Sequence, residues 1–288
     1  FCVFDADNLV HLDFLAVMNT RLMKGQKVLQ GYLSAKNPVD TWVSGTFAIA
    51  FWTVNHLWHL GKYNLGLSSC LGGTGMCISA DIVQEFGWGC DCLTEDMEFS
   101  MKCLSHGIRT CWVHDAIIYD EKPLTFMASW RQRKRWAQGQ FDCSERYIPI
   151  LMKEGFKRHS IVVLDGIMQL LQNYFLLISA FYLVMTYINM FYPCFTVVLY
   201  NDALVPRQFW SVLGTIQYVL PLIVLLQIEV PAKIYLYWLI YPVFMYSWVP
   251  VTFLGWIHRH EKQWVHTIHT RSMQFQAASL TRKKEIDS

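Results

Sequence analysis

The stretch FCVFDADN, residues 1–8, decides the fold of the first half of the chain. Its apolar residues lead into the polar segment Asp5-Ala6-Asp7-Asn8, as in a buried strand that ends at the carboxyl edge of a sheet. Residues 9–24 follow with a helical pattern, and Gly25 predicts its end. The apolar positions of this pattern are Leu12, Leu15, Ala16 and Met23.

The same alternation continues through residue 160. We expect a strand over 28–35, short helices over 79–86 and 94–106, and a strand over 110–119. Strands that alternate with helices predict an α/β layered domain over 1–160. Ligands of such sheets bind outside the carboxyl ends of the strands.

The composition excludes several classes of protein. Only 16% of the 288 residues are charged and 53% are hydrophobic, whereas soluble domains carry about a quarter charged residues. The formal net charge of +2 argues against nucleic acid as the main partner. Nine cysteines without a CxxC pair indicate reduced thiols of a cytosol-facing protein.

Residues 161–257 form the apolar part of the chain and carry only five Asp, Glu, Lys or Arg residues. Three runs without such residues, 166–201, 208–228 and 234–257, reach the roughly 20 residues that a helix needs to cross a bilayer. They predict three or four transmembrane helices and a multi-pass protein of the cell membrane. The uncharged stretch 41–61 is polar enough that we expect an amphipathic helix there instead, packed on a sheet or on the membrane face.

Basic flanks predict the orientation. Residues 131–159 hold eight Lys or Arg against three acids, and the tail 258–288 holds six against three, so both flanks and the α/β domain should be cytoplasmic. Two cytoplasmic flanks require an even number of crossings, but three runs are present. Either residues 161–173 form an interfacial helix before a span that begins at Tyr174, or the run interrupted by Pro242 and Pro250 is re-entrant.

Two acidic motifs are candidates for chemistry. Asp5 and Asp7 at a strand end could hold Mg²⁺ or Mn²⁺ against a diphosphate, because these cations prefer oxygen ligands; an Asx turn is the alternative. Asp96 in Thr94-Glu95-Asp96 opens a helix, where the dipole would keep a general base ionised. Simple N-terminal capping is the alternative there.

Two further motifs could bind ligands. In Gln132-Arg133-Lys134-Arg135-Trp136, Arg135 could grip phosphate or a sugar hydroxyl and Trp136 offers a flat face to a pyranose ring. Anchoring to the membrane surface would explain Arg131, Arg133 and Lys134, but neither Gln132 nor Trp136. The glycine run Gly72-Gly73-Thr74-Gly75 permits close backbone approach to a ligand or forms a plain turn.

The four motifs occur in the order FDADN, GGTG, TED and QRKRW, and the apolar runs follow them. With this order the chain resembles the processive family-2 glycosyltransferases, such as cellulose, hyaluronan, chitin and poly-N-acetylglucosamine synthases. Trp264-Val265-His266-Thr267 and Thr270-Arg271 are similar to the tail of bacterial members. The resemblance implies a GT-A-type catalytic domain followed by a helical transmembrane region. It also implies that the strands and the aspartate that hold the nucleotide base precede residue 1.

The resemblance further implies a role for each motif residue. Asp5 and Asp7 would hold the metal and the donor diphosphate, and Asp96 would deprotonate the acceptor hydroxyl. Binding of the acceptor or the pyrophosphate would fall to Gln132, Arg135, Trp136, Glu95, Gly73, Thr74 and Gly75, with Cys77 beside the acceptor. The enzyme would be an inverting, metal-dependent hexosyltransferase that passes a sugar from UDP-N-acetylglucosamine or UDP-glucose to a growing β-linked polysaccharide and exports it.

Two alternatives stay open at this point. A non-processive enzyme would add one sugar to a lipid acceptor and would give single-sugar products. A transporter or membrane scaffold would use the aspartates only as turn and cap residues, and Asp96→Asn would then leave sugar transfer unchanged.

Overall fold

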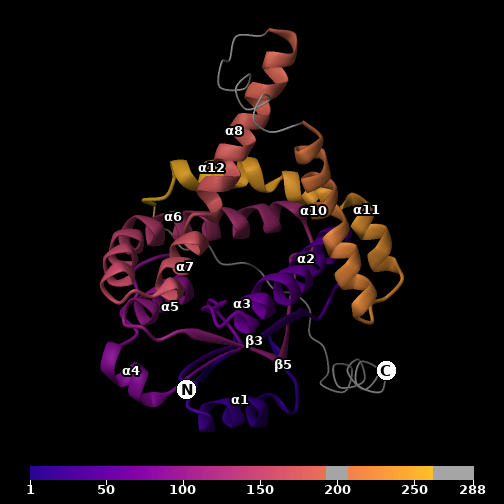
Figure 1. Cartoon of the computed structure of the whole chain (residues 1–288). Coiled ribbons are helices and arrows are strands. Elements are labelled where there is room, and N and C mark those ends of the chain that lie inside the picture. The colour runs from indigo at the N-terminus through magenta and orange to yellow at the C-terminus, as the bar shows by residue number, and fades with distance from the viewer. Residues whose placement is uncertain (193–206, 262–288) are drawn as a thin grey trace.

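The computed structural model describes residues 1–192 and 207–261, and its first half is a mixed sheet covered by helices on both faces. Figure 1 shows α1 (Phe14–Met23) on one face of the sheet and α2 (Trp42–Thr53) on the other. Long helices of the second half then cover the α2 side. The predicted α/β class of residues 1–160 is therefore confirmed.

The sheet has five strands in the order β1-β4-β3-β5-β2. The strands are β1 (Cys2–Val3), β2 (Leu9–Val10), β3 (Val28–Ala35), β4 (Met76–Ile78) and β5 (Thr110–Asp120). Only β3 and β5 run parallel; the other pairs are antiparallel. All of β3 is buried, which explains its unbroken apolar run.

The first 24 residues differ from the sequence-based expectation. Cys2 and Val3 are exposed rather than buried, because β1 lies at the edge of the sheet and pairs only with β4. Leu9 and Val10 are not helical; they pair with the end of β5. As a result α1 begins at Phe14, and its inward residues are Phe14 and Met18.

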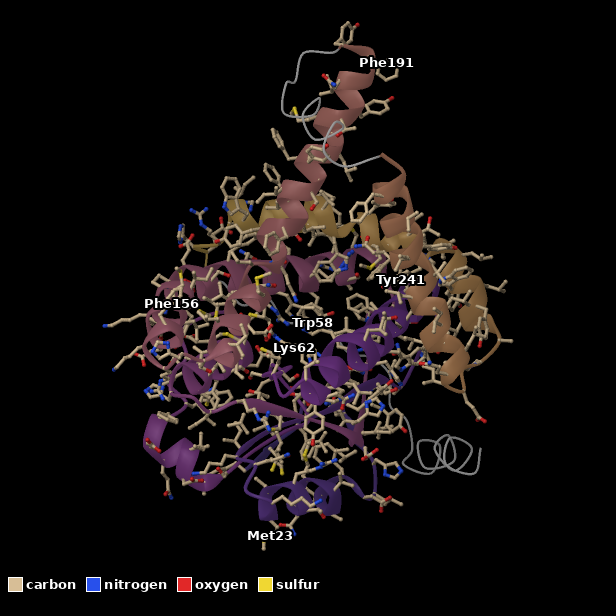
Figure 2. All side chains as sticks on the ribbon, viewed as in Figure 1. Met23, Trp58, Lys62, Phe156, Phe191 and Tyr241 are labelled. Atoms are coloured by element: carbon tan, nitrogen blue, oxygen red, sulfur yellow. The ribbon has the colours of Figure 1, made fainter. Side chains whose placement is uncertain are left out.

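The apolar positions predicted to face inward on this first helix are largely outside. Leu12, Leu15 and Met23 are 60% or more exposed, and Figure 2 shows Met23 on the outer side of α1. The predicted helical phase was therefore wrong, although Gly25 does end the helix, with a φ of +83°.

The uncharged stretch 41–61 folds as α2, the π-helix η1 (Val54–His59) and α3 (Leu60–Asn64). It packs on the sheet as predicted, but α2 is not amphipathic. Most of its residues are buried, because one side meets β3 while another meets later helices: Phe47 contacts Phe244 with ring centroids 5.1 Å apart. A reciprocal cap between Thr41 and Ser44 fixes its start.

The two short helices agree with prediction. They are α4 (Ala80–Phe86) and α5 (Glu95–Ser105), each followed by a glycine of positive φ, Gly87 and Gly107. Thr94 occupies the N-cap position of α5, although its side chain makes no capping hydrogen bond.

The second half is helical. Its elements are α6 (Phe126–Lys157), α7 (Ile161–Leu170), α8 (Gln172–Phe191), α10 (Arg207–Gln227), α11 (Lys233–Tyr246) and α12 (Trp248–Ile257). A largely buried ion pair, Lys62 to Asp165 at 2.7 Å, ties α3 to α7. Figure 2 shows Lys62 in the interior, whereas Trp58 of η1 is 37% exposed. Of the predicted tail 258–288, residues 262–288 lie outside the described part of the chain.

One described helix, 233–257, is long and apolar enough to cross a membrane, and the bent pair α7 and α8 would be a second if it forms one broken span. The bend of 50° between α7 and α8 falls where an interfacial helix was expected to give way to a spanning one. The predicted three or four crossings and their orientation stay predictions.

Buried histidines predict acid sensitivity. Burial, and next the charge of Lys62, lower the pKa of His59 to about 4; burial, and next the charge of His56, lower the pKa of His114 to about 4. The unfolded chain therefore binds more protons than the folded one between pH 6.5 and 4, and stability falls as the pH drops through this window.

We expect a lower melting temperature at pH 5 than at pH 7, with a contribution on the order of 1–2 kcal/mol for each histidine. Protonation of other groups adds to the change, so the decisive comparison is His114→Asn, which keeps an acceptor for the indole N–H of Trp112. This variant should lose less stability between the two pH values; an unchanged loss would contradict the assignment.

Candidate active site

A cavity of about 760 Å³ opens at the carboxyl ends of β3 and β5. Side chains from all four sequence motifs line it: Asp5, Asp7, Gly73, Thr74, Glu95, Asp96, Gln132, Arg135 and Trp136. Residues that are far apart in the chain therefore meet at the edge of the sheet where ligands of α/β domains bind.

Thr74 joins the glycine loop to the DADN segment. Its hydroxyl oxygen accepts hydrogen bonds from the backbone N–H of Asp5, at 3.0 Å, and from the side-chain amide of Asn8. A backbone bond from Asn8 N–H to Asp5 O, at 3.1 Å, closes the DADN turn. The turn and the glycine loop thus hold each other at the cavity rim.

Gly73 and Gly75 have different roles in the loop. Gly73 adopts a φ of +78°, and a Cβ there would lie 3.5 Å from Oδ2 of Asp96, so the loop passes close to this carboxylate. Gly75 does not line the cavity; its N–H and C=O bond to Val3 and Gly31 within the sheet. Cys77 is likewise buried in β4 rather than beside the acceptor space, contrary to the expectation for both residues.

Asp96 faces the cavity from the first turn of α5. Burial, and next the charge of Glu95, raise the pKa of Asp96 to about 7, while backbone N–H groups and Arg135 act in the opposite direction. The helix start was expected to keep this group ionised, but burial outweighs the dipole. A pKa near neutrality suits a general base, which must both lose and accept a proton.

The helix α6 carries the QRKRW motif in its second and third turns. Thr125 caps the helix by accepting a hydrogen bond from Ala128 N–H at 3.3 Å. Because residues three and four apart share a face, Gln132, Arg135 and Trp136 all point to the cavity.

Arg135 lies among carboxylates. Burial lowers the pKa of its guanidinium, and the negative charges of Glu95, Asp96 and Asp5 oppose this. The guanidinium therefore forms the electrostatic link between the strand-end aspartates and the start of α5.

Trp136 is held by aromatic neighbours. Its ring lies 6.0 Å from Phe47 and 6.3 Å from Phe51, both on α2. The indole is only partly buried and lines the cavity, so part of its face is available to a ligand.

The basic character of Arg133 suggested a membrane-surface anchor, but the structure contradicts this. It is fully buried on the side of α6 that faces α11 and α12, where its Nη1 donates to Ser247 Oγ at 2.8 Å. The reason is helical phase, since Arg133 lies on a different face from Arg135.

Sequence reasoning missed a buried charged network at the ends of β3 and β5. Lys36 lies 3.2 Å from Glu121 and donates to the backbone O of Asp7 at 2.8 Å, while Lys122 pairs with Asp120 at 2.8 Å. Burial lowers the pKa of Lys122. The strand-end rule could have identified these residues, because they follow the predicted strands directly.

Two buried polar atoms of cavity-lining residues, Asn8 Oδ1 and Gln132 Oε1, have no hydrogen-bond partner in the described residues. Leaving a buried polar group unsatisfied is costly, so such groups point to a polar ligand. Hydroxyl and amide groups of a sugar would match these oxygens.

The residues at the DADN turn fit a hard divalent cation. The candidate ligand atoms are oxygens, from the carboxylates of Asp5 and Asp7 and from the side-chain amide of Asn8, and the Asp7 carboxylate also lies 3.8 Å from Lys36 Nζ. No group of three or more His, Cys, Asp or Glu suited to a metal occurs in the two described ranges. A cation would therefore need phosphate oxygens as well, which is how Mg²⁺ is commonly bound.

Comparison with known families agrees with this geometry. The family model described as "Glycosyl transferase family group 2" matches residues 1–251, so the chain belongs to this family of glycosyltransferases. The chain is also similar to the probable glycosyltransferase YdaM of Bacillus subtilis (strain 168), with 26% identity over 141 residues. That alignment covers 48% of this chain and 34% of the relative, so the chain spans about a third of the relative's length.

Gly139 allows α6 to lie directly against the start of α5. A Cβ at this position would be 2.6 Å from Thr94 Oγ1 and 2.7 Å from Thr94 N. Gly139→Ala should therefore push the Thr94-Glu95-Asp96 segment away from α6 and destabilise the protein by about 1–3 kcal/mol. Thermal unfolding measures the loss, and a drop in sugar transfer should accompany it.

Gly61→Ala is the matched control, because Gly61 also lies in a helix but a Cβ there would have no atom within 4 Å. It should be neutral or slightly stabilising, as expected from helix propensity. Equal stability of the two variants would contradict the close-contact role of Gly139.

Proposed function

We propose that this protein is an inverting membrane glycosyltransferase that extends a β-linked polysaccharide from a UDP-sugar, on a catalytic domain of the GT-A type. The observation that carries the proposal is the meeting of Asp5, Asp7, Asp96, Arg135 and Trp136 in one cavity. Family membership supports sugar transfer from a nucleotide donor.

In the proposed reaction Asp96 acts as the general base. Its carboxylate accepts the proton of the acceptor hydroxyl while that oxygen forms a bond to the anomeric carbon of the donor. The bond from this carbon to the diphosphate oxygen breaks, and the diphosphate leaves with the electron pair. A single displacement by one base inverts the α-linked donor to a β-linkage.

Arg135 stabilises the leaving diphosphate. Its position among Asp5, Glu95 and Asp96 places a fixed positive charge between the metal-binding turn and the base. Mg²⁺ or Mn²⁺, held by Asp5 and Asp7, would neutralise further negative charge on the diphosphate. Trp136 would pack against the terminal ring of the acceptor.

The charge of the cavity favours a neutral sugar. Six carboxylates line it, Asp5, Asp7, Glu95, Asp96, Asp120 and Glu121, against the single guanidinium of Arg135. Even with Lys36 and Lys122 paired to two of these acids, negative charge remains in excess. Arg135 and the proposed cation would be engaged by the diphosphate, so the remaining carboxylates would repel an anionic uronic acid. We therefore propose N-acetylglucosamine or glucose as the transferred sugar.

For the membrane part, we propose that α11 and α12 lie along the catalytic domain instead of crossing the bilayer. The start of this segment is tied to the domain by Lys233, which donates to Val39 O at 2.9 Å. Its middle is tied by Arg133 to Ser247, and its end by Arg259 to Glu145 at 2.6 Å. A 25-residue helix that crosses a bilayer has its two ends on opposite sides, about 37 Å apart.

This arrangement gives an even number of crossings. The segments of α8 and the first part of α10 would then form the membrane hairpin, because the last turns of α10 pack against α2 with Val224 and Leu225 fully buried. Both basic flanks would be cytoplasmic. Figure 1 shows α8 rising away from the α/β domain while α12 lies across α6, and Figure 2 shows Phe191 at the far end of α8. Exposed apolar residues of α11 and α12 would face lipid: Leu236, Leu239, Val243, Phe253, Trp256 and Ile257.

Labelling of single cysteines with a membrane-impermeant maleimide tests the topology. Glu229→Cys and Glu261→Cys, placed before and after the two helices, should both react only from the cytoplasmic side, and Tyr192→Cys only from the other side. The parent protein measures the labelling of native cysteines. Reaction of positions 229 and 261 from opposite sides would show that this segment crosses the bilayer.

Asp96→Asn tests the proposed base. Sugar transfer should fall about 10²–10⁴-fold, as for the loss of a general base, while the fold stays intact because a buried charge is removed. Transfer by the wild type should rise with pH through about 7, since only the ionised carboxylate accepts a proton. Asp91→Asn, an exposed position on the preceding loop, is the control and should keep activity.

A screen of UDP-sugars in membranes, with and without Mn²⁺ or Mg²⁺, tests donor and cofactor. The proposal predicts metal-dependent incorporation of N-acetylglucosamine or glucose into long products. Single-sugar lipid products would instead support the non-processive enzyme, and unchanged transfer by Asp96→Asn would remove the base assignment.

A further inference from the structure

Trp248 brings a second indole to the catalytic cavity from a distant part of the chain. It is the first residue of α12, outside the four sequence motifs, and it lines the cavity together with Trp136. The side chain is only partly buried and packs at the margin of the aromatic cluster that also includes Phe47 and Phe244. Part of Trp248 is therefore available to a ligand.

Arg133 holds the segment that carries Trp248. Its guanidinium carbon lies 4.5 Å from the ring centre of Phe244, 5.1 Å from Trp248 and 5.7 Å from Phe126. Its Nη1 donates to the hydroxyl of Ser247, the residue between α11 and α12. The side chain thus contacts both sides of the helix junction at once.

This burial is energetically demanding. Arg133 is 0% exposed, no carboxylate among the described residues pairs with it, and burial lowers its pKa to about 10. A buried charge without an ionic partner is retained only where its surroundings stabilise it. Here three aromatic faces, the hydroxyl of Ser247 and the backbone O of Ser129, which accepts from Nε at 3.4 Å, do so. These contacts fix the Ser247–Trp248 corner relative to α6.

The same helix carries the acceptor-side residues on its other face. Gln132, Arg135 and Trp136 point to the cavity, whereas Arg133 points to the α11–α12 junction. An indole presents a flat apolar surface to the C–H groups of a pyranose ring. Two indoles that line one cavity suit a sugar chain better than a small hydroxyl acceptor.

We propose that Trp248 is a second acceptor-contact residue, which binds a sugar ring of the acceptor glycan, and that Arg133 is a positioning residue that sets the place of Trp248. This inference rests on the proposed function and goes beyond it, because it assigns an acceptor contact to a residue outside the family motifs.

The test uses the purified protein with UDP-N-acetylglucosamine or UDP-glucose, whichever is transferred, and a β-linked tetrasaccharide of the same sugar as acceptor. Trp248→Ala should raise the acceptor KM about tenfold, the equivalent of ~1.4 kcal/mol. Hydrolysis of the donor without acceptor, and the donor KM, should stay within about twofold. Trp248→Phe should retain most of the acceptor affinity, because it keeps an aromatic face.

Arg133→Met should raise the acceptor KM in the same selective way, and the double variant should be no worse than Trp248→Ala alone, because Arg133 acts through Trp248. Trp256→Ala is the matched control: it lies on α12, is 41% exposed and does not line the cavity. It should keep the wild-type acceptor KM.

A wild-type acceptor KM in Trp248→Ala, additive effects of the two substitutions, or an equal loss of donor hydrolysis in both Trp248 variants would overturn the inference. A wild-type protein that neither hydrolyses nor transfers any UDP-sugar would overturn the proposed function, and the inference with it.

Discussion

The close contact between α6 and the start of α5 is the constraint on which the site depends. Gly139 leaves room for Thr94 to lie against the helix, so the base candidate Asp96 and the QRKRW residues face one cavity. Arg135 then offsets part of the negative charge of Asp5, Glu95 and Asp96. Without this contact Asp96 and the indole of Trp136 would belong to separate surfaces.

The sequence predicted the interior of the domain better than its beginning. The expected strand 28–35 coincides with β3, because a strand buried on both faces has an unbroken apolar run. The two-residue strands β1 and β2 are too short to show a periodic pattern of apolar residues. Because β2 occupies residues 9–10, the first helix begins only at Phe14. The conformation of these segments depends on pairing with distant strands, which the local sequence pattern does not report.

The candidate site was predicted in its motif residues and missed in its supporting ones. Helical spacing alone places Arg133 and Arg135 on different faces of α6. The prediction for Arg133 did not use this spacing, because it rested on the basic character of the residue. Trp248 depends on how α12 packs against α6, and no spacing rule reports such a contact. The pKa of Asp96 depends on burial, which the helix start by itself did not indicate.

The most direct test of the convergence is a cryo-electron microscopy structure of the protein with a non-transferable UDP-sugar analogue and Mn²⁺. We expect the diphosphate between Asp7 and Arg135, with the anomeric carbon on the side of Asp96 Oδ2 and the indole of Trp136 facing the acceptor space. A nucleotide bound outside this cavity, or an Asp96 carboxylate that faces away from the sugar, would contradict the proposed convergence.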